Sequence, residues 1–313
     1  MKLSHMGRLV ALRTTVIFVF VGCGGQSQGQ SILPQGPSAV RRQHGTSNPL
    51  LYVSAENSSY VLSYPEGKVV GTIAQAAAGA CSDELGNVYF VYGKSILVYT
   101  HGSTTASQTL TLPSDGAHCS VDPLSGNLAV ALANQLDIAF FTPPYGQPTV
   151  YQLYGFVAHY CGYDNAGNLF IDGYNKGDNP GLAEVAAGSG NISYISLSLP
   201  EDSYPETLQW DGNYLAMTVQ RSQKVNPHIA IDRLSISGST ATVVSSTTIK
   251  GVKHHVGASW LYDNQVTIIY STSRGFPNIG IWSYPKGGRP VHRIINIGGK
   301  QAVLSGVAVS VAP

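Results

Sequence analysis

The sequence predicts an all-β fold, a six-bladed β-propeller, and three observations lead to this prediction. A unit made of a short apolar strand, an Asp-led turn and a second apolar strand recurs along the chain. A second unit, a strand followed by a glycine turn and another strand, alternates with the first. The C-terminal segment supplies a strand that the series otherwise lacks, so the repeats close into a ring.

The Asp-led unit occurs five times. Its turns begin at Asp83, Asp122, Asp164, Asp211 and Asp263, at successive spacings of 39, 42, 47 and 52 residues. An Asp followed by Gly-Asn supplies the left-handed backbone positions that a tight hairpin needs. Repeats of roughly 40–50 residues with four short strands each are typical of propeller blades.

The glycine-turn unit occurs six times, once more than the Asp-led unit. Its copies are Tyr64–Gly67, Tyr99–Gly102, Phe141–Gly146, Val185–Gly188, Leu234–Gly238 and Tyr284–Gly287. The count predicts that residues 303–311 form the inner strand of a last blade whose outer strands come from residues 50–74. Such closure removes exposed sheet edges and ties down both termini. A β-sandwich or a linear solenoid would not explain a blade shared between the two ends.

The first 22 residues have the pattern of a signal peptide. Lys2, Arg8 and Arg13 precede an apolar run over residues 14–21, which is too short for the roughly 20 residues that span a bilayer. The run ends in Phe20-Val21-Gly22-Cys23, which resembles the bacterial lipobox, with Phe where Leu is usual. The resemblance implies acylation of Cys23 and a stable membrane anchor. The alternative is an ordinary signal peptide with an incidental Cys.

Residues 23–48 are rich in Gln, Gly, Ser and Pro and are predicted to form a flexible tether, which leaves residues 49–313 for the propeller. We expect an exported monomer that is lipid-anchored in the cell envelope, at the outer membrane or the cell surface. The net charge is +1, and the longest basic run is the pair Arg41-Arg42. This composition argues against nucleic acid as a partner.

The blade pattern resembles the six-bladed propellers of the NHL-repeat and gluconolactonase-like superfamily. The resemblance covers residues 50–313 and rests on the D-x-x-G-N turns at Asp83–Asn87 and Asp164–Asn168 and on strands such as Asn87–Val91. It implies a fold more than a reaction, because this group includes lactonases, esterases, lyases and binding scaffolds. Its lactonase-like enzymes hold a divalent metal in the central channel with Glu, Asn and Asp.

The residues that begin the predicted inner strands are the candidates for such chemistry, and Glu206 is the only carboxylate among them. With His118, His159 and His254 or His255, it would suit a divalent metal that keeps an open position. His118 or His159 would also suit a general acid. Strand alternation, however, points these two imidazoles to opposite faces. We therefore favour hydrogen bonds between the imidazoles and the backbone of neighbouring blades.

Cys81, Cys119 and Cys161 each lie on a predicted inner strand. Export would allow one disulfide and leave one thiol. We favour the alternative that all three pack as small buried residues. The sequence contains no C-x-x-C, dinucleotide or phosphate-loop pattern.

Tyrosine is the main aromatic residue, with 18 copies. Several lie at predicted blade turns, namely Tyr64, Tyr145, Tyr154, Tyr174, Tyr204 and Tyr284. Exposed tyrosines on a rigid scaffold are typical of binding surfaces. We therefore expect a binding or scaffold module for an envelope protein or a glycan, without a cofactor. The alternative is an enzyme at the channel mouth, either a metal-dependent lactonase-like hydrolase or a His-assisted lyase.

Overall fold

The structure is a computed structural model that describes residues 48–133, 136–176, 179–200, 203–221, 228–252, 256–271, 276–295, 297 and 303–312. These residues all belong to the second of two units of the chain, residues 44–313. The predicted signal peptide, the tether up to residue 47, Cys23 and the candidates His254 and His255 lie outside the described residues. Within the described ranges, no helix has the length and apolar character needed to cross a membrane.

The described strands form five sheets. The first has the order β24 (Leu304–Ser310), β1 (Leu50–Ala55), β2 (Ser59–Ser63) and β3 (Val69–Ile73). Two more are β4 (Gly79–Ser82), β5 (Val88–Tyr92), β6 (Ser95–Tyr99) and β7 (Gln108–Thr111), and β8 (Gly116–Val121), β9 (Leu128–Leu132), β10 (Asp137–Phe141) and β11 (Thr149–Gln152). An eight-stranded sheet runs β12 (Phe156–Tyr163), β13 (Leu169–Asn175), β14 (Asn179–Val185), β15 (Ile192–Ser198), β19 (Thr240–Ile249), β18 (His228–Ser237), β17 (Leu215–Arg221) and β16 (Ser203–Trp210). The last contains β20 (Val256–Tyr262), β21 (Gln265–Ser271), β22 (Pro277–Ser283) and β23 (His292–Ile295).

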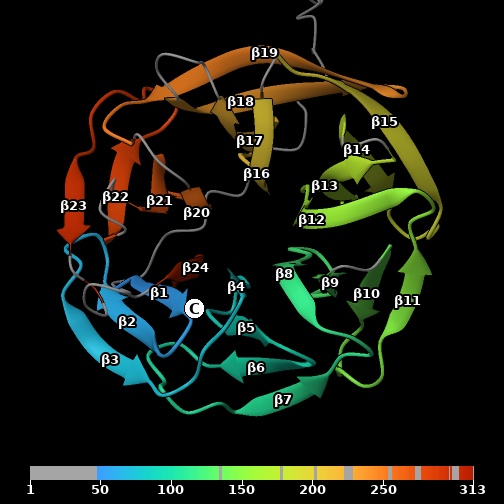
Figure 1. Cartoon of the computed structure of the whole chain (residues 1–313). Coiled ribbons are helices and arrows are strands. Elements are labelled where there is room, and N and C mark those ends of the chain that lie inside the picture. Colours follow the sequence, from blue (N-terminus) through green and yellow to red (C-terminus); the bar gives the residue numbers. More distant parts are fainter. Residues whose placement is uncertain are drawn as a thin grey trace, which may run out of the picture. The chain divides into compact units, whose positions relative to one another are not determined.

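The sheets stand around a central axis like the blades of a propeller (Figure 1). Their inner strands β4, β8, β12, β16, β20 and β24 contact one another in a closed ring. The predicted propeller architecture is therefore confirmed. The strands divide into four four-stranded sheets and one eight-stranded sheet, whereas six blades were predicted. In the eight-stranded sheet, β15 and β19 pair in parallel from Ser196↔Thr240 to Ser198↔Thr242.

The two ends of the described chain meet in one sheet, as the repeat count predicts. β1 pairs antiparallel with β24, from Leu50↔Ser310 to Ala55↔Leu304. The predicted inner strand at residues 303–311 is thus confirmed, with bounds Leu304–Ser310. Leu51 and Val307 of this sheet are buried in one apolar cluster with Ile279 of β22, so the closing sheet also packs against its neighbour.

The Asp-led turns have the predicted hairpin chemistry. Oδ1 of Asp83 accepts hydrogen bonds from the backbone N–H groups of Leu85 (2.9 Å) and Asn87 (2.8 Å). Asp164 accepts the equivalent pair of bonds in its own turn. Gly86 and Gly167 have φ values of 80° and 81°, a left-handed conformation that glycine adopts without steric cost. The repeated Asp-x-x-Gly-Asn sequence therefore fixes each hairpin locally.

A disulfide joins two neighbouring sheets, and our preference for three packed free cysteines was wrong for two of them. Cys81 of β4 and Cys119 of β8 are bonded, with their Cα atoms 5.6 Å apart. Cys161 is a buried free thiol, as the packing hypothesis predicts. The repeat explains why Cys161 has no partner. Cys119 bonds to Cys81, which lies two residues before the Asp of the preceding repeat. The residue at that position in the repeat that precedes Cys161 is Ser120, so Cys161 meets a serine instead of a cysteine.

Candidate functional site

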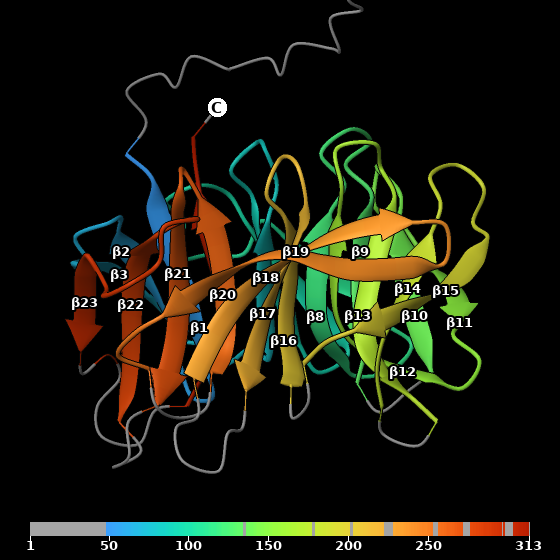
Figure 2. The same cartoon turned by 90° about the horizontal axis from the view of Figure 1, so that it is seen from above.

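Five of the six inner strands, all except β4, carry β-bulges near the end at which they begin. We call this end the mouth of the ring. The pairing register shifts between Gly116 and Cys119 in β8 and between Ala158 and Cys161 in β12. β16, β20 and β24 have comparable shifts near their first residues. In Figure 2, β20 runs upward from the mouth, so the mouth lies at the lower edge of that view. A bulge sets extra residues against one partner and re-aims their side chains.

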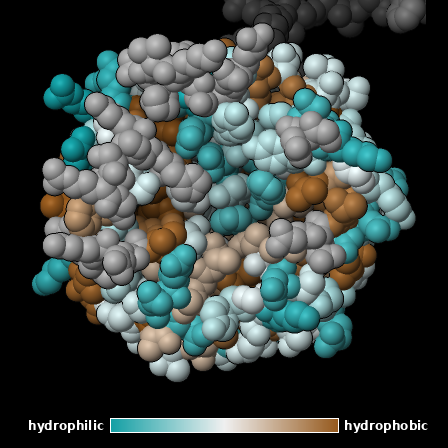
Figure 3. Space-filling view, viewed as in Figure 1, coloured by the Kyte–Doolittle hydropathy of each residue, from teal (hydrophilic) through white to brown (hydrophobic). Residues whose placement is uncertain are grey.

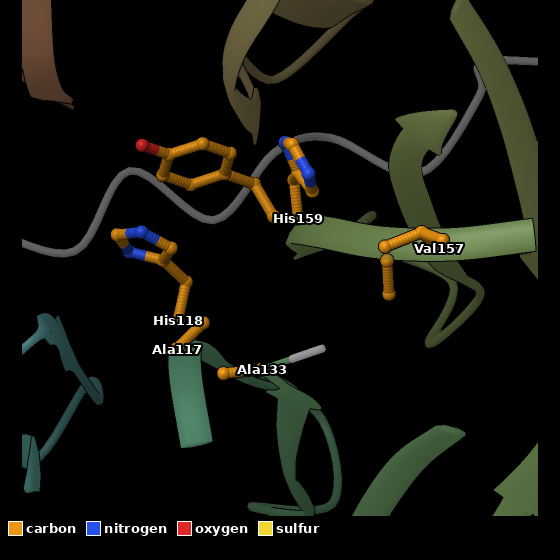
Figure 4. A pocket seen from close by; sticks show the side chains of 7 residues that line it. Ala117, His118, Ala133, Val157 and His159 are labelled. Carbon is orange, nitrogen blue, oxygen red and sulfur yellow. The ribbon is translucent and has the colours of Figure 1, made fainter. Parts of the chain in front are cut away.

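The bulges bring the two predicted imidazoles together. His118 and His159 line one pocket of about 210 Å³, with both rings on the same side (Figure 4). The remaining lining residues are Ala117, Ala133, Val157, Ala158 and Tyr160. The expectation that the imidazoles point to opposite faces was wrong, because strand alternation does not hold where a bulge interrupts the pairing.

His118 makes its contact with the next sheet through its ring. It stacks on Tyr160 with ring centroids 3.8 Å apart, whereas we expected a hydrogen bond to the neighbouring backbone. Gly79 leaves room for this ring, since a Cβ there would lie 2.8 Å from Nδ1 of His118. Burial, with a smaller effect of His159, lowers the pKa of His118 to about 3. His118 is therefore neutral at physiological pH.

His159 lies at the exposed rim of the pocket. Its ring meets Tyr174 edge to face, with centroids 5.0 Å apart. Partial burial lowers the pKa of His159 as well. Neither imidazole therefore brings a positive charge to the mouth at pH 7.

Asp172 of β13 is a site residue that the sequence analysis missed. It is fully buried across the β12 bulge, and its Oδ1 accepts a 2.8 Å hydrogen bond from the backbone N–H of Tyr160. Its Oδ2 has no hydrogen-bond partner among the residues that the structure describes. Burial raises the pKa of Asp172 to about 7, although the Tyr160 bond acts in the opposite direction. The signal in the sequence is a carboxylate that ends the apolar run over residues 169–171, because such residues are rarely buried without a role.

Glu206 lies at the bulge of β16 and is half-buried. Burial and the nearby charge of Asp172 raise the pKa of Glu206 to about 8. The pKa values of Tyr160 and Tyr174 are also raised, mainly by burial and to a smaller extent by the charges of Glu206 and Asp172. These groups belong to one electrostatic unit, which we call the mouth cluster and define as His118, His159, Tyr160, Asp172, Tyr174 and Glu206.

The predicted metal set is assembled only in part. His118 and His159 share a pocket, and Glu206 interacts with Asp172. His255 lies outside the described residues. Across the described ranges, no three His, Cys, Asp or Glu side chains lie close enough together to hold a metal ion. The mouth cluster contains neutral imidazoles, phenols, and carboxyl groups that hold protons near neutral pH. All of these groups can form hydrogen bonds with a ligand, and the carboxyl groups can also transfer protons to it.

The six tyrosines predicted at blade turns fall into three groups, and the first, Tyr145 and Tyr174, is half-buried. Tyr64 and Tyr284 are buried in the core. Tyr154 and Tyr204 are 75% and 45% exposed, and Tyr204 precedes Glu206 by two residues on β16. The mouth face in Figure 3 has hydrophilic side chains gathered around its centre. An exposed aromatic ring therefore stands beside the mouth cluster.

Comparison with known proteins supports the fold alone. No protein-family model matches the chain, and no curated protein matches it. A solved nidogen/laminin complex is similar with a TM-score of 0.64 and 14% identity, over 84% of this chain and 98% of that one. A Bacteroides caccae protein of unknown function has a TM-score of 0.61 and 13% identity, over 84% and 99% of the two chains. The Cps50 (Swd1) β-propeller domain of Myceliophteria thermophila has a TM-score of 0.53 and 9% identity, over 79% and 83%. Together with the closed ring of inner strands, these likenesses define the class of this protein as a β-propeller.

Proposed function

We propose that this protein is an exported, lipid-anchored binding module that recognises an envelope protein or a glycan at the mouth of its propeller. The observation that carries the proposal is the mouth cluster, in which His118, His159 and Tyr160 of neighbouring sheets line one pocket and Asp172 is bonded directly behind Tyr160. Asp172 in this cluster is fully buried, and no side chain or backbone group in the described part of the chain pairs with its Oδ2. Buried polar atoms are nearly always paired for stability, so an unpaired carboxyl oxygen beside a pocket favours a ligand-binding role.

We further infer that the propeller has six blades. The eight-stranded sheet contains two antiparallel four-stranded meanders, β12–β15 and β16–β19. They join through only three residue pairs at their outer strands, while β12 and β16 both take their places in the ring of inner strands. Counting each meander as one blade gives the expected number and fits the NHL-like and gluconolactonase-like resemblance of the D-x-x-G-N turns.

Export and anchoring rest on the sequence and on one bond. Residues 1–22 would be the signal peptide, Cys23 the lipidated N-terminus and residues 23–48 the tether. The disulfide between Cys81 and Cys119 supports an oxidising compartment. Labelled palmitate should enter the parent chain and place it in the membrane fraction, whereas Cys23→Ser should remove both the label and the membrane association. Label that persists in Cys23→Ser would contradict the assignment.

The similar nidogen/laminin structure is a complex of proteins, which supports a protein partner for this chain. The experiment compares the full chain with Tyr204→Ala and His159→Ala in binding to a glycan array and in cross-linking to envelope proteins. Tyr154→Ala is the matched control, since Tyr154 is exposed and interacts with Tyr194, whereas Tyr204 interacts with Tyr174 of the mouth cluster. Binding that is lost in the two mouth variants and kept in the control supports the proposal. Binding that all three variants retain would move the ligand away from the mouth.

A second candidate function is acid–base catalysis at the same place. Glu206 has a pKa of about 8, so it can donate a proton at neutral pH, close to the range that suits a general acid. Lactone and ester panels assayed with the parent and with Glu206→Gln test this candidate. Turnover that disappears in Glu206→Gln while the fold is kept would favour the enzyme. Absence of turnover in the parent would leave the binding role as the function of the mouth.

A further inference from the structure

The mouth pocket presents ring nitrogens that the described part of the chain leaves unpaired. His118 and His159 both line the pocket, with their rings on the same side (Figure 4). His118 contacts Tyr160 through the face of its ring. Within the described ranges, no hydrogen bond reaches a ring nitrogen of His118 or His159, whereas Nδ1 of His101 lies 2.9 Å from Oγ of Ser310. Each neutral imidazole has one donor and one acceptor, which a ligand in the pocket can use.

The rest of the lining is small and apolar. It consists of Ala117, Ala133, Val157 and Ala158, which we call the apolar wall. Burial lowers the pKa values of both imidazoles and raises the pKa of the Tyr160 phenol, so the lining residues themselves carry no charge at pH 7. The pocket therefore combines a polar edge with an apolar wall, and its own lining is neutral.

Tyr160 gives the pocket a floor that is fixed before a ligand arrives. Its hydroxyl donates a 3.0 Å hydrogen bond to the backbone carbonyl of Gly257 in β20, and its backbone N–H donates to Asp172. The centroids of its ring and the His118 ring are 3.8 Å apart. A side chain that is already held in this way loses little conformational freedom on binding, which favours affinity for a small ligand.

We propose that this pocket binds one neutral pyranose ring of a glycan. The sugar hydroxyls would pair with the imidazoles of His118 and His159, and the C–H groups of the sugar ring would pack on the apolar wall. A hydroxyl group both donates and accepts hydrogen bonds, so neighbouring hydroxyls can satisfy the donor and the acceptor of an imidazole. This inference rests on the proposed binding function and assigns the pocket to a glycan rather than to a protein side chain.

Other ligands fit the same contacts less well. An apolar side chain of a protein would cover the imidazole nitrogens without pairing them, and unpaired polar groups weaken binding. An ionic group would lose its hydration among lining residues that offer no opposite charge. The volume of about 210 Å³ lies below the roughly 300–1,000 Å³ of pockets that take drug-sized ligands, which suits a single ring.

Titration calorimetry on the full chain, in a detergent without a sugar head group, tests the proposal. The methyl glycosides of glucose, galactose and mannose are titrated first. The ring that binds best is then compared with its uronic acid, which is negative, and its amino sugar, which is positive. We expect both charged sugars to bind at least about tenfold more weakly than the neutral one. A hydroxymethyl tetrahydropyran, which keeps the ring but has no ring hydroxyls, should also bind about tenfold more weakly.

Variants separate the hydrogen bonds of the imidazoles from the shape of their rings. His159→Phe keeps an aromatic ring at the rim and removes both nitrogens, so it should weaken binding of the neutral glycoside about three- to tenfold. His118→Phe keeps a ring to stack on Tyr160 and should have a similar effect. His292→Phe is the matched control, because His292 is an exposed histidine of β23 that does not line the pocket. Circular dichroism and thermal unfolding of each variant show whether the fold is kept.

Three outcomes would overturn the pyranose site. They are absence of binding by every neutral glycoside, equal binding of neutral and charged sugars, and full affinity in folded His159→Phe. The proposed function fails separately, because it depends on whether His159→Ala and Tyr204→Ala lose the envelope ligand. A protein partner that is lost in those variants, without any glycoside binding, would leave the binding module intact and this inference wrong.

Discussion

The backbone N–H of Tyr160 donates a 2.8 Å hydrogen bond to Oδ1 of Asp172 across the bulge of β12. This bond holds the segment that presents His159 and Tyr160 to the pocket. Asp172→Ala should lower the free energy of unfolding by about 1–3 kcal/mol, because it leaves a buried N–H without an acceptor. Asp172→Asn keeps an oxygen acceptor and should lose less. Urea unfolding followed by tryptophan fluorescence measures both, and equal losses would show that the bond does not stabilise the bulge.

The mouth cluster should make stability depend on pH. The folded pKa values of Asp172 and Glu206 are about 7 and about 8, whereas unfolded carboxyl groups titrate near 4. The folded state therefore holds protons that the unfolded state has released, so stability falls as pH rises through this range. Below about pH 6.5 the lowered pKa of His118 acts in the opposite direction.

The clean window for this effect is about pH 7 to 9, where the unfolded imidazole is mostly neutral. Across it we expect the free energy of unfolding to fall by about 1–2 kcal/mol. The double variant Asp172→Asn with Glu206→Gln should flatten the profile. Glu184→Gln, which changes a half-buried acid of β14 outside the mouth cluster, should not. A parent profile that rises with pH in this window would contradict the assigned protonation states.

The disulfide between Cys81 and Cys119 should contribute measurably to stability. It closes a loop with a sequence separation of 38 residues, for which loss of chain entropy predicts about 2–4 kcal/mol. A reducing agent should therefore lower the thermal midpoint of the parent chain. The double variant Cys81→Ser with Cys119→Ser should unfold at the reduced parent's midpoint and respond to no reductant. A parent that unfolds at one temperature in both conditions would argue against the bond.

Two equivalent tyrosines allow a matched comparison of hydrogen bonds. The hydroxyl of Tyr284 donates to Oδ2 of Asp211 at 2.7 Å, and that carboxylate also pairs with Arg233. The hydroxyl of Tyr64 donates to the neutral side chain of Gln265 at 2.8 Å. Bonds to charged groups contribute more than neutral ones, so Tyr284→Phe should cost about 1 kcal/mol more than Tyr64→Phe. Denaturant unfolding of the two variants decides the order, and equal costs would remove the charge effect.

Closure of the ring should be required for cooperative folding. Deletion of residues 304–313 removes β24 and exposes the buried strand β1 on one edge. We expect the truncated chain to lose its sharp thermal transition and to become sensitive to proteases, since open edges and lost core contacts both destabilise. Removal of residues 312–313 alone should leave the transition unchanged. A sharp transition without β24 would show that the remaining sheets fold independently.

Most of the fold could be predicted from the sequence because its turns are locally encoded. Asp83 and Asp164 form their hairpins with the same side-chain bonds, and the repeat count places β24 beside β1. The parallel pairing of β15 with β19 could not be predicted, because it depends on where two outer strands meet in space and has no sequence pattern.

The candidate site could be predicted only in part. The beginnings of the inner strands identified His118, His159 and Glu206, but alternation gave the wrong directions for the imidazoles, since the bulges have no clear signature in the sequence. Asp172 was missed because it comes from the second strand of its sheet. Which cysteines meet depends on the stagger between neighbouring inner strands, and counting residues from each Asp does not show that stagger.

The pairing of Leu50 with Ser310 also determines at which end of the ring β1 begins. Ser310 ends β24, so the chain enters the ring at the end opposite the mouth, where the inner strands begin. A partner held at the mouth would therefore not meet the segment that leads into β1, so a fusion or label attached before residue 48 is expected to leave the His118–Tyr160 pocket accessible.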